Sequence, residues 1–204
     1  MHDINPLTDL SKQFSFILEI DKLKAIYRRT MVKNDNNRQE NSAEHSWHIS
    51  LCAQLLHEYA EQKVDINRVI RMLLIHDIVE IDAGDMFAFD DPSLMAEQEE
   101  KEIAAAKRIF GLLPDSQSDG MLNLWLEFEE ATSNDARFAK SIDRILPLVQ
   151  NMANNGGSWA INKVRKSQVI QRNIYLKGLS PKLWVYVNQQ IEIACVNSWL
   201  INDD

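Results

Sequence analysis

The sequence predicts an all-α protein of about seven to nine helices in a single domain. Apolar residues recur at helical spacing through most of the 204 residues, and no segment shows the alternation typical of a strand. Six glycines and five prolines are too few for the many tight turns of a β-sandwich or barrel. With 45% hydrophobic and 25% charged residues, the chain can bury a core of its own.

The charge and the cysteines exclude several classes of function. The net charge is −8 and no basic run is present, which disfavours a nucleic-acid duplex as a partner. A local basic pocket for one small phosphate compound is compatible with this overall charge. No apolar run is long enough to span a membrane, and residues 1–6 show no signal-peptide pattern. Cys52 and Cys195 lie in separate apolar patterns, so we expect buried thiols in a cytoplasmic protein.

The first two expected helices are separated by a polar segment. The first helix is expected to end near Tyr27, and residues 33–39 lack periodicity and predict a loop. Asn41 and Glu44 have the spacing of a capping box, so a second helix is expected from there to about residue 61. Its expected apolar face consists of Trp47, Leu51, Cys52, Leu55, Leu56 and Tyr59.

The third expected helix is the most apolar segment of the chain. It runs from residue 66 to about residue 81, with Asp65 as its N-cap. Residues 72–75 are apolar on all sides, so this helix is expected at the centre of the fold.

Four further helices are expected in the remaining sequence. A charged helix begins at Asp91-Pro92 and ends at residue 110, and helices over 121–131 and 135–152 follow. The last helix begins at Ser180-Pro181. Its expected apolar face consists of Leu183, Trp184, Val187, Ile191, Ala194, Cys195 and Trp199.

The most informative polar motif lies in the most apolar helix, where Asp77 follows His76. An ionised Asp rarely enters a core without a partner, and a metal ion can supply one; the alternative is an Asp bound to a neighbouring helix N-terminus. Glu80 shares the helical face, and Asp82 and Asp85 follow. Four acids in nine positions repel one another unless a cation or water organises them.

Further ligand candidates lie on two other helices. His45 and His48 share one side of the second helix, and antiparallel packing against the third helix can bring imidazole and carboxylate groups to about 2.0 to 2.2 Å from a divalent ion. Asp143 lies between apolar residues of its helix and is the best candidate for a fourth ligand. Its alternative is a buried pair with a neighbouring arginine.

Taken in order, these residues resemble the signature of the HD-domain metal-dependent phosphohydrolases, a family of single helical bundles. More narrowly, Glu44-His45-Ser46, residues 76–85 and Arg28-Arg29 are similar to its 5′-deoxynucleotidase branch. The resemblance is strongest over residues 14–171. It predicts one HD domain over residues 1–204, in which 172–204 form a C-terminal helical extension.

The resemblance implies a cofactor and a set of site residues. The implied cofactor is one divalent ion, Mn²⁺, Co²⁺ or a similar transition metal, with Zn²⁺ and Mg²⁺ as alternatives. Its implied ligands are His45, His76, Asp77 and Asp143. The implied catalytic residues are Glu80, Asp85 and Asp77. The residues expected to contact phosphate or substrate are Arg29, Glu44 and His48.

The implied reaction removes the 5′-phosphate of deoxynucleoside monophosphates with metal-activated water. Thr30 follows Arg29, where the most similar nucleotidases have an aromatic residue, so a ribonucleotide, a nucleoside triphosphate or a cyclic dinucleotide is an alternative substrate. A second alternative is a non-catalytic nucleotide-binding module with a structural metal. Arg28 is expected to point about 100° away from Arg29 if the first helix extends that far. Apolar-rich terminal helices predict a homodimer.

Overall fold

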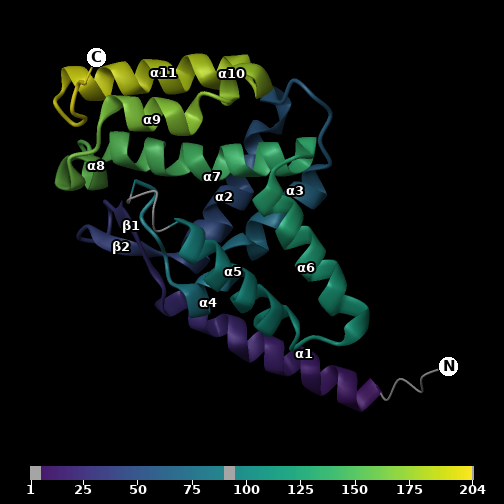
Figure 1. Ribbon diagram of the computed structural model, residues 1–204. Helices are drawn as coiled ribbons and strands as arrows, with labels where there is room; N and C mark the ends of the chain where they lie inside the picture. The colour runs from purple at the N-terminus through teal and green to yellow at the C-terminus, as the bar shows by residue number, and fades with distance from the viewer. Residues whose placement is uncertain (1–5, 90–94, 204) are drawn as a thin grey trace.

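The computed structural model describes residues 6–89 and 95–203 and confirms the all-α class (Figure 1). Its α-helices are α1 Pro6–Ile20, α2 Ser42–Leu56, α3 Ile66–Ile75, α4 Glu80–Ala83, α5 Met95–Phe110, α6 Asp115–Glu130, α7 Asn134–Ala153, α8 Gly157–Asn162, α9 Lys166–Asn173, α10 Leu176–Leu179 and α11 Pro181–Val196. Three short 3₁₀ helices are η1 Asp21–Ala25, η2 His57–Tyr59 and η3 His76–Val79. The expected helix start at Asp91-Pro92 lies outside the described residues.

One local expectation is wrong: residues 27–41 form a β-hairpin instead of a helix end and a loop. Strand β1, Tyr27–Val32, pairs antiparallel with β2, Arg38–Asn41, and Val32 lies opposite Arg38. The chain reverses through Asn36 and Asn37, whose φ angles are 52° and 57°, a conformation that Asn tolerates better than most residues. The polar sequence therefore gave no signal for this strand pair, whose pairing depends on the turn at Asn36 and Asn37.

Helix α2 begins at the expected capping box but presents an unexpected face to the core. The amide of Glu44 donates to Asn41 Oδ1 at 2.9 Å. Trp47 is 62% exposed and Leu55 72% exposed, whereas His45 is fully buried. The helix packs on α3 and α7 through His45, three serines, Ile49 and Ala53. Trp47, Leu51 and Leu55, on the opposite side of α2, therefore face outward.

The third helix changes geometry at the motif of interest. Helix α3 ends at Ile75, and the chain continues as η3 and then α4, so His76 and Asp77 lie on a 3₁₀ turn and not in mid-helix. The indole N–H of Trp125 donates to the His76 carbonyl at 3.1 Å and supports this turn. Met72, Leu73 and Ile75 are buried, but Leu74 is 47% exposed, so the helix is not buried on all sides as expected.

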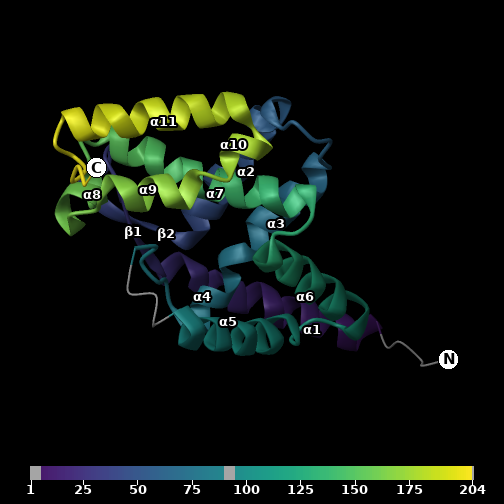
Figure 2. The ribbon, with the colours of Figure 1, turned by 45° about the horizontal axis from the view of Figure 1, so that its top comes forward.

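Helix α7 is the central element of the fold (Figures 1 and 2). One hydrophobic core lies between α7 and the helices α2, α3, α5 and α6, and a second lies between α7 and α8, α9 and α11. Ile142 contributes to the first core, and Ile145 and Leu148 contribute to the second. Functional groups on α7 are thereby fixed by packing on both sides.

The remaining expectations are confirmed only in part. Helix α11 begins at Pro181 and buries Leu183, Val187, Ile191 and Ala194, as expected. Cys52 and Cys195 form no disulfide bond and are half-buried. Within the part of the chain that the structure describes, no helix combines the length and apolarity needed to cross a membrane.

Candidate metal and phosphate site

Three elements bring His45, His76 and Asp143 together. His45 lies in the first turn of α2, His76 begins η3, and Asp143 lies in the middle of α7. The ligand atoms of these residues all lie within 4.8 Å of one another. His45 Nε2 is 3.0 Å from Asp143 Oδ1, and His76 Nε2 is 3.7 Å from the same oxygen. Residues separated by up to 98 positions thus converge on one point.

Asp77 lies beside this cluster. Its Oδ1 is 2.9 Å from His76 Nε2, and its Oδ2 accepts a hydrogen bond of 2.5 Å from Arg28 Nη1. The structure therefore brings together all four residues that the sequence implied as metal ligands. Two imidazoles and two carboxylates form a donor set suited to a divalent transition metal.

The outer nitrogens of both imidazoles provide an independent test of whether the site fits a metal. His76 Nδ1 lies 2.8 Å from the Leu73 carbonyl, which can only accept, so Nδ1 carries the proton. His45 Nδ1 lies 3.3 Å from Glu40 Oε2. A histidine that binds a metal usually donates its other N–H to a carbonyl or carboxylate, as His76 does, which leaves Nε2 free to coordinate. The residues present fit a divalent metal ion.

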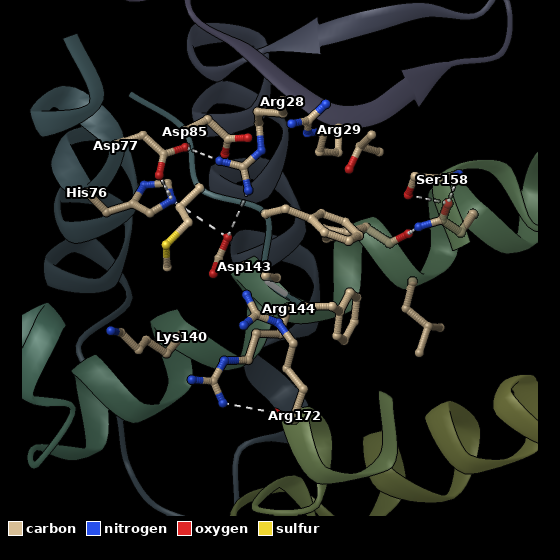
Figure 3. Close-up of a pocket in the computed structure, with 18 of the residues that line it drawn as sticks. Arg28, Arg29, His76, Asp77, Asp85, Lys140, Asp143, Arg144, Ser158 and Arg172 are labelled. Carbon is tan, nitrogen blue, oxygen red and sulfur yellow. Dashed lines mark hydrogen bonds and ion pairs between the residues drawn. The ribbon is translucent and has the colours of Figure 1, made fainter. Parts of the chain in front are cut away.

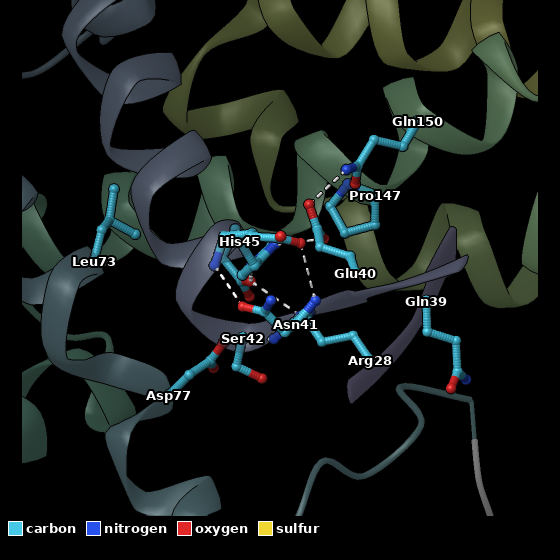
Figure 4. A network of polar contacts seen from close by, with 12 residues as sticks. Arg28, Gln39, Glu40, Asn41, Ser42, His45, Leu73, Asp77, Pro147 and Gln150 are labelled. Carbon is cyan, nitrogen blue, oxygen red and sulfur yellow. Dashed lines mark hydrogen bonds and ion pairs between the residues drawn. The ribbon is translucent and has the colours of Figure 1, made fainter. Parts of the chain in front are cut away.

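Glu40 is a feature of this site that the sequence analysis missed (Figure 4). It lies on β2, is 3% exposed, and accepts a 2.8 Å hydrogen bond from Gln150 on α7. Its other oxygen faces His45. Neither apolar periodicity nor ligand spacing distinguishes Glu40 from the polar residues around it, because its position depends on the hairpin.

Replacing Glu40 with Gln is expected to weaken metal binding by about 10- to 100-fold, since the carboxylate lies against Nδ1 of His45 and orients its ring. Competition with a chelating dye measures the dissociation constant of the metal. Gln39→Glu, at an exposed neighbouring position, is the control. Unchanged affinity in Glu40→Gln would show that Glu40 does not support the ligand.

The charged groups of the site shift one another's pKa values. Burial opposes a charged His76, but Asp77 and Asp143 outweigh it and raise the pKa of His76 to about 10. Burial likewise opposes a charged Asp77, but Arg28 and His76 hold the pKa of that carboxyl below its usual range. Without a bound cation, the proton on His76 and the guanidinium of Arg28 therefore neutralise the ligand carboxylates.

Arg28 is the arginine at the centre of the site. Its side chain is 13% exposed and lies 3.7 Å from Glu80 and 3.8 Å from Asp143, in addition to its bond with Asp77. Arg29 is exposed but lines the same pocket. The expected angle of about 100° between these two side chains required the first helix to extend this far. It does not, because both residues lie on β1.

Two further carboxyl groups expected to act in catalysis also line the pocket. Glu80 is 8% exposed and accepts a 2.5 Å hydrogen bond from Ser42. Burial and the negative charge of Asp77 raise the pKa of Glu80 well above its usual value. Burial also raises the pKa of Asp85. Both shifts favour the protonated forms of these carboxyl groups.

Glu44 and His48 lie elsewhere. Glu44 closes the capping box of α2 and pairs with Arg38 through both oxygens, at 2.8 and 2.9 Å. The ring of His48 lies 5.8 Å from that of Trp47. Neither residue is among those that line the pocket next to His76.

That pocket has a volume of about 320 Å³, within the range of small-molecule sites. Asp77, Asp85 and Arg28 lie along one side of it, and Asp143 lies near its centre (Figure 3). Phe87, Phe89, Trp159 and Val169 form apolar parts of the wall. The metal-ligand cluster thus opens into a space that can hold a small molecule with a polar and an apolar part.

The fold and this site define a helical metal-dependent hydrolase of the HD type. A profile of the HD domain family matches residues 20–184, and the chain belongs to this family.

Individual relatives refine the comparison. The crystal structure of a predicted metal-dependent phosphohydrolase from Magnetospirillum magnetotacticum MS-1 is 45% identical, covers 96% of this chain and 97% of that one, and superposes with a TM-score of 0.90. The yeast 5′-deoxynucleotidase YGK1 is 30% identical over 142 residues, 68% of this chain and 64% of the yeast protein. Human 5′-deoxynucleotidase HDDC2 is 27% identical over 135 residues, 66% of this chain and 64% of the human protein.

Proposed function

We propose that this protein is a metal-dependent phosphomonoesterase that removes the 5′-phosphate from deoxynucleoside monophosphates. The convergence of His45, His76, Asp77 and Asp143 beside Arg28 carries the proposal. It places a set of metal-ligand groups next to a guanidinium that can bind phosphate oxygens. Relatives named 5′-deoxynucleotidases support the choice of substrate.

The mechanism assigns a role to each group in the pocket. A divalent metal held by His45, His76, Asp77 and Asp143 would polarise a phosphoryl oxygen and lower the pKa of bound water. Arg28 and Arg29 bind phosphate oxygens and stabilise the charge that develops on them. Glu80 and Asp85 are the candidates for orienting the attacking water and for giving a proton to the leaving 5′-oxygen. Asp77 is a poor proton donor, since its pKa is lowered.

The donor set favours a particular group of metals. The two imidazole nitrogens suit transition ions such as Co²⁺ and Zn²⁺ better than Mg²⁺, which prefers oxygen ligands throughout, and the two carboxylates suit Mn²⁺. We propose Mn²⁺ or Co²⁺ as the activating ion, with Zn²⁺ and Mg²⁺ as alternatives.

Phosphate release from a panel of nucleotides tests the proposed reaction. The purified protein, loaded in turn with each of the four metals, is expected to hydrolyse deoxynucleoside 5′-monophosphates at least about tenfold more efficiently than ribonucleotides, a discrimination of about 1.4 kcal/mol. Preference for a ribonucleotide, a triphosphate or a cyclic dinucleotide would identify another phosphohydrolase. Nucleotide binding without phosphate release under any metal would favour the non-catalytic module.

We further propose that the protein is a cytoplasmic homodimer. Helix α1 exposes Phe14 by 56% and Leu18 by 74%, and α2 exposes Trp47, Leu51 and Leu55 on one side. Apolar stripes of this kind mark association surfaces. Light scattering at micromolar concentration is expected to give twice the 23.5 kDa of one chain; a mass of one chain would contradict the dimer.

A further inference from the structure

Two arginines lie across the pocket from Arg28 and Arg29. Arg144 follows the ligand Asp143 on α7, and Arg172 lies on α9; both line the pocket. Figure 3 shows Arg28 and Arg29 on one side, Arg144 and Arg172 on the other, and Asp143 between them. The pocket therefore has a second cationic wall.

Among the residues that the structure describes, no ion pair joins Arg144 or Arg172 to a carboxylate within 4.0 Å. Arg144 instead donates to the backbone carbonyl of Arg172 at 2.9 Å and lies over the ring of Tyr175, 4.8 Å from its centre. Lys140 differs, since its ammonium bonds Glu129 at 2.6 Å. Burial lowers the pKa of Arg172, and the positive charge of Arg144 lowers it further, while Asp143 opposes both.

The two arginines of this wall lack a direct counter-ion among the described residues of the pocket. Asp77 and Asp143 together balance a divalent metal, and Arg28 and Arg29 balance the dianionic phosphate that is hydrolysed. Glu80, Asp85, Glu102 and Glu129 also line the pocket. Glu80 lies beside Arg28 and Glu129 bonds Lys140, and none of the four comes within ion-pair distance of Arg144 or Arg172. Arg144 and Arg172 therefore have no adjacent carboxylate, in a partly desolvated setting where an unpaired charge is costly.

We propose that Arg172, supported by Arg144, binds a second anionic group of the substrate, so that the pocket accepts a nucleotide with a phosphate on its sugar in addition to the scissile 5′-phosphate. A nucleoside 3′,5′-bisphosphate is the simplest such compound. Guanidinium forks match the geometry of phosphate oxygens. This inference rests on the proposed function and narrows its substrate class.

Binding to the metal-loaded protein tests the subsite separately from catalysis. The probes are two 5′-methylenephosphonate analogues of deoxyadenosine monophosphate, one with and one without a 3′-phosphate, whose P–C bond is not hydrolysed. By calorimetry, the 3′-phosphorylated analogue is expected to bind about 10- to 100-fold more tightly than the other, the range of a charge-assisted contact.

Variants then test which residue causes the tighter binding of the 3′-phosphorylated analogue. Arg172→Gln is expected to abolish the preference while changing the affinity of the unphosphorylated analogue by less than about threefold. Arg71→Gln is the matched control, since Arg71 is exposed on α3 and does not line the pocket. Arg172→Lys is expected to retain part of the preference, because the charge remains without the planar fork.

Each outcome has a distinct meaning. Equal affinity of the two analogues for the wild-type protein overturns the proposed subsite, even if Arg172→Gln fails to fold. Failure of the wild-type protein to bind either analogue also overturns it. Equal weakening of both analogues in Arg172→Gln places that arginine on the 5′-phosphate and also overturns the proposal. Phosphate release from deoxyadenosine monophosphate itself reports on the proposed function independently of these results.

Discussion

Asp77→Ala is expected to lose the bound metal and at least about a thousandfold in kcat/KM, because a metal contributes several kcal/mol to transition-state stabilisation and each 1.4 kcal/mol is a factor of ten. The carboxylate faces His76 with one oxygen and Arg28 with the other. Its removal takes away one ligand and the principal counter-charge of two buried cations. Elemental analysis together with phosphate release measures both losses.

The same substitution should also destabilise the metal-free protein by about 3 to 5 kcal/mol, the scale of breaking a buried ion pair. Urea denaturation in the presence of a chelator measures this difference, and circular dichroism checks that the variant remains helical. Asp82→Ala is the control, since Asp82 is exposed and pairs with Arg108 away from the ligands. A metal content equal to that of the wild-type protein would remove Asp77 from the ligand set.

Long periodic helices could be predicted from the sequence because burial of one face dominates their energetics. Helices α7 and α11 begin within one residue of the positions that their sequence predicted. The hairpin could not be predicted, since β1 and β2 are stabilised by a turn and by packing on α2 and α7. The orientation of α2 was predicted wrongly, because the close packing of its small residues and His45 outweighs burial of Trp47 and Leu55.

The ligand residues could be predicted because their type and order restrict the chemistry, even though the geometry that joins them is tertiary. His45, His76 and Asp143 come from separate helices, and only the packing of α2 and α3 against α7 brings them together. Glu40 and Arg28 lie on the unexpected hairpin. Sequence reasoning therefore singled out the proposed ligand residues, which the structure brings together, and missed the residues that contact them from the hairpin.

The second large effect is expected at Arg28. Arg28→Ala should lower kcat/KM, with a loss of about 2 to 4 kcal/mol in transition-state stabilisation. This is the scale of a lost electrostatic donor in a transition state. Its guanidinium is 13% exposed and faces Asp77, Glu80 and Asp143, so its removal also leaves three carboxyl groups with less positive charge. The variant is therefore expected to bind metal with altered affinity and to unfold more readily without it.

Arg29→Ala provides the matched comparison on the adjacent residue of β1. Arg29 lines the pocket but is exposed, and water screens the interactions of an exposed charge more strongly. Metal content should stay unchanged in this variant, and the loss in kcat/KM should be smaller than in Arg28→Ala, because only a phosphate contact is removed.

Metal analysis and steady-state kinetics on the two variants separate their roles. A larger kinetic loss in Arg29→Ala, with intact metal, would make Arg29 the principal phosphate ligand, as the sequence resemblance implies, and would leave Arg28 to neutralise the carboxylates. Losses of equal size in both variants would show that the two side chains share the phosphate. The expected order, with Arg28 first, follows from burial: the guanidinium with less access to water has the stronger interaction with charge that develops beside it.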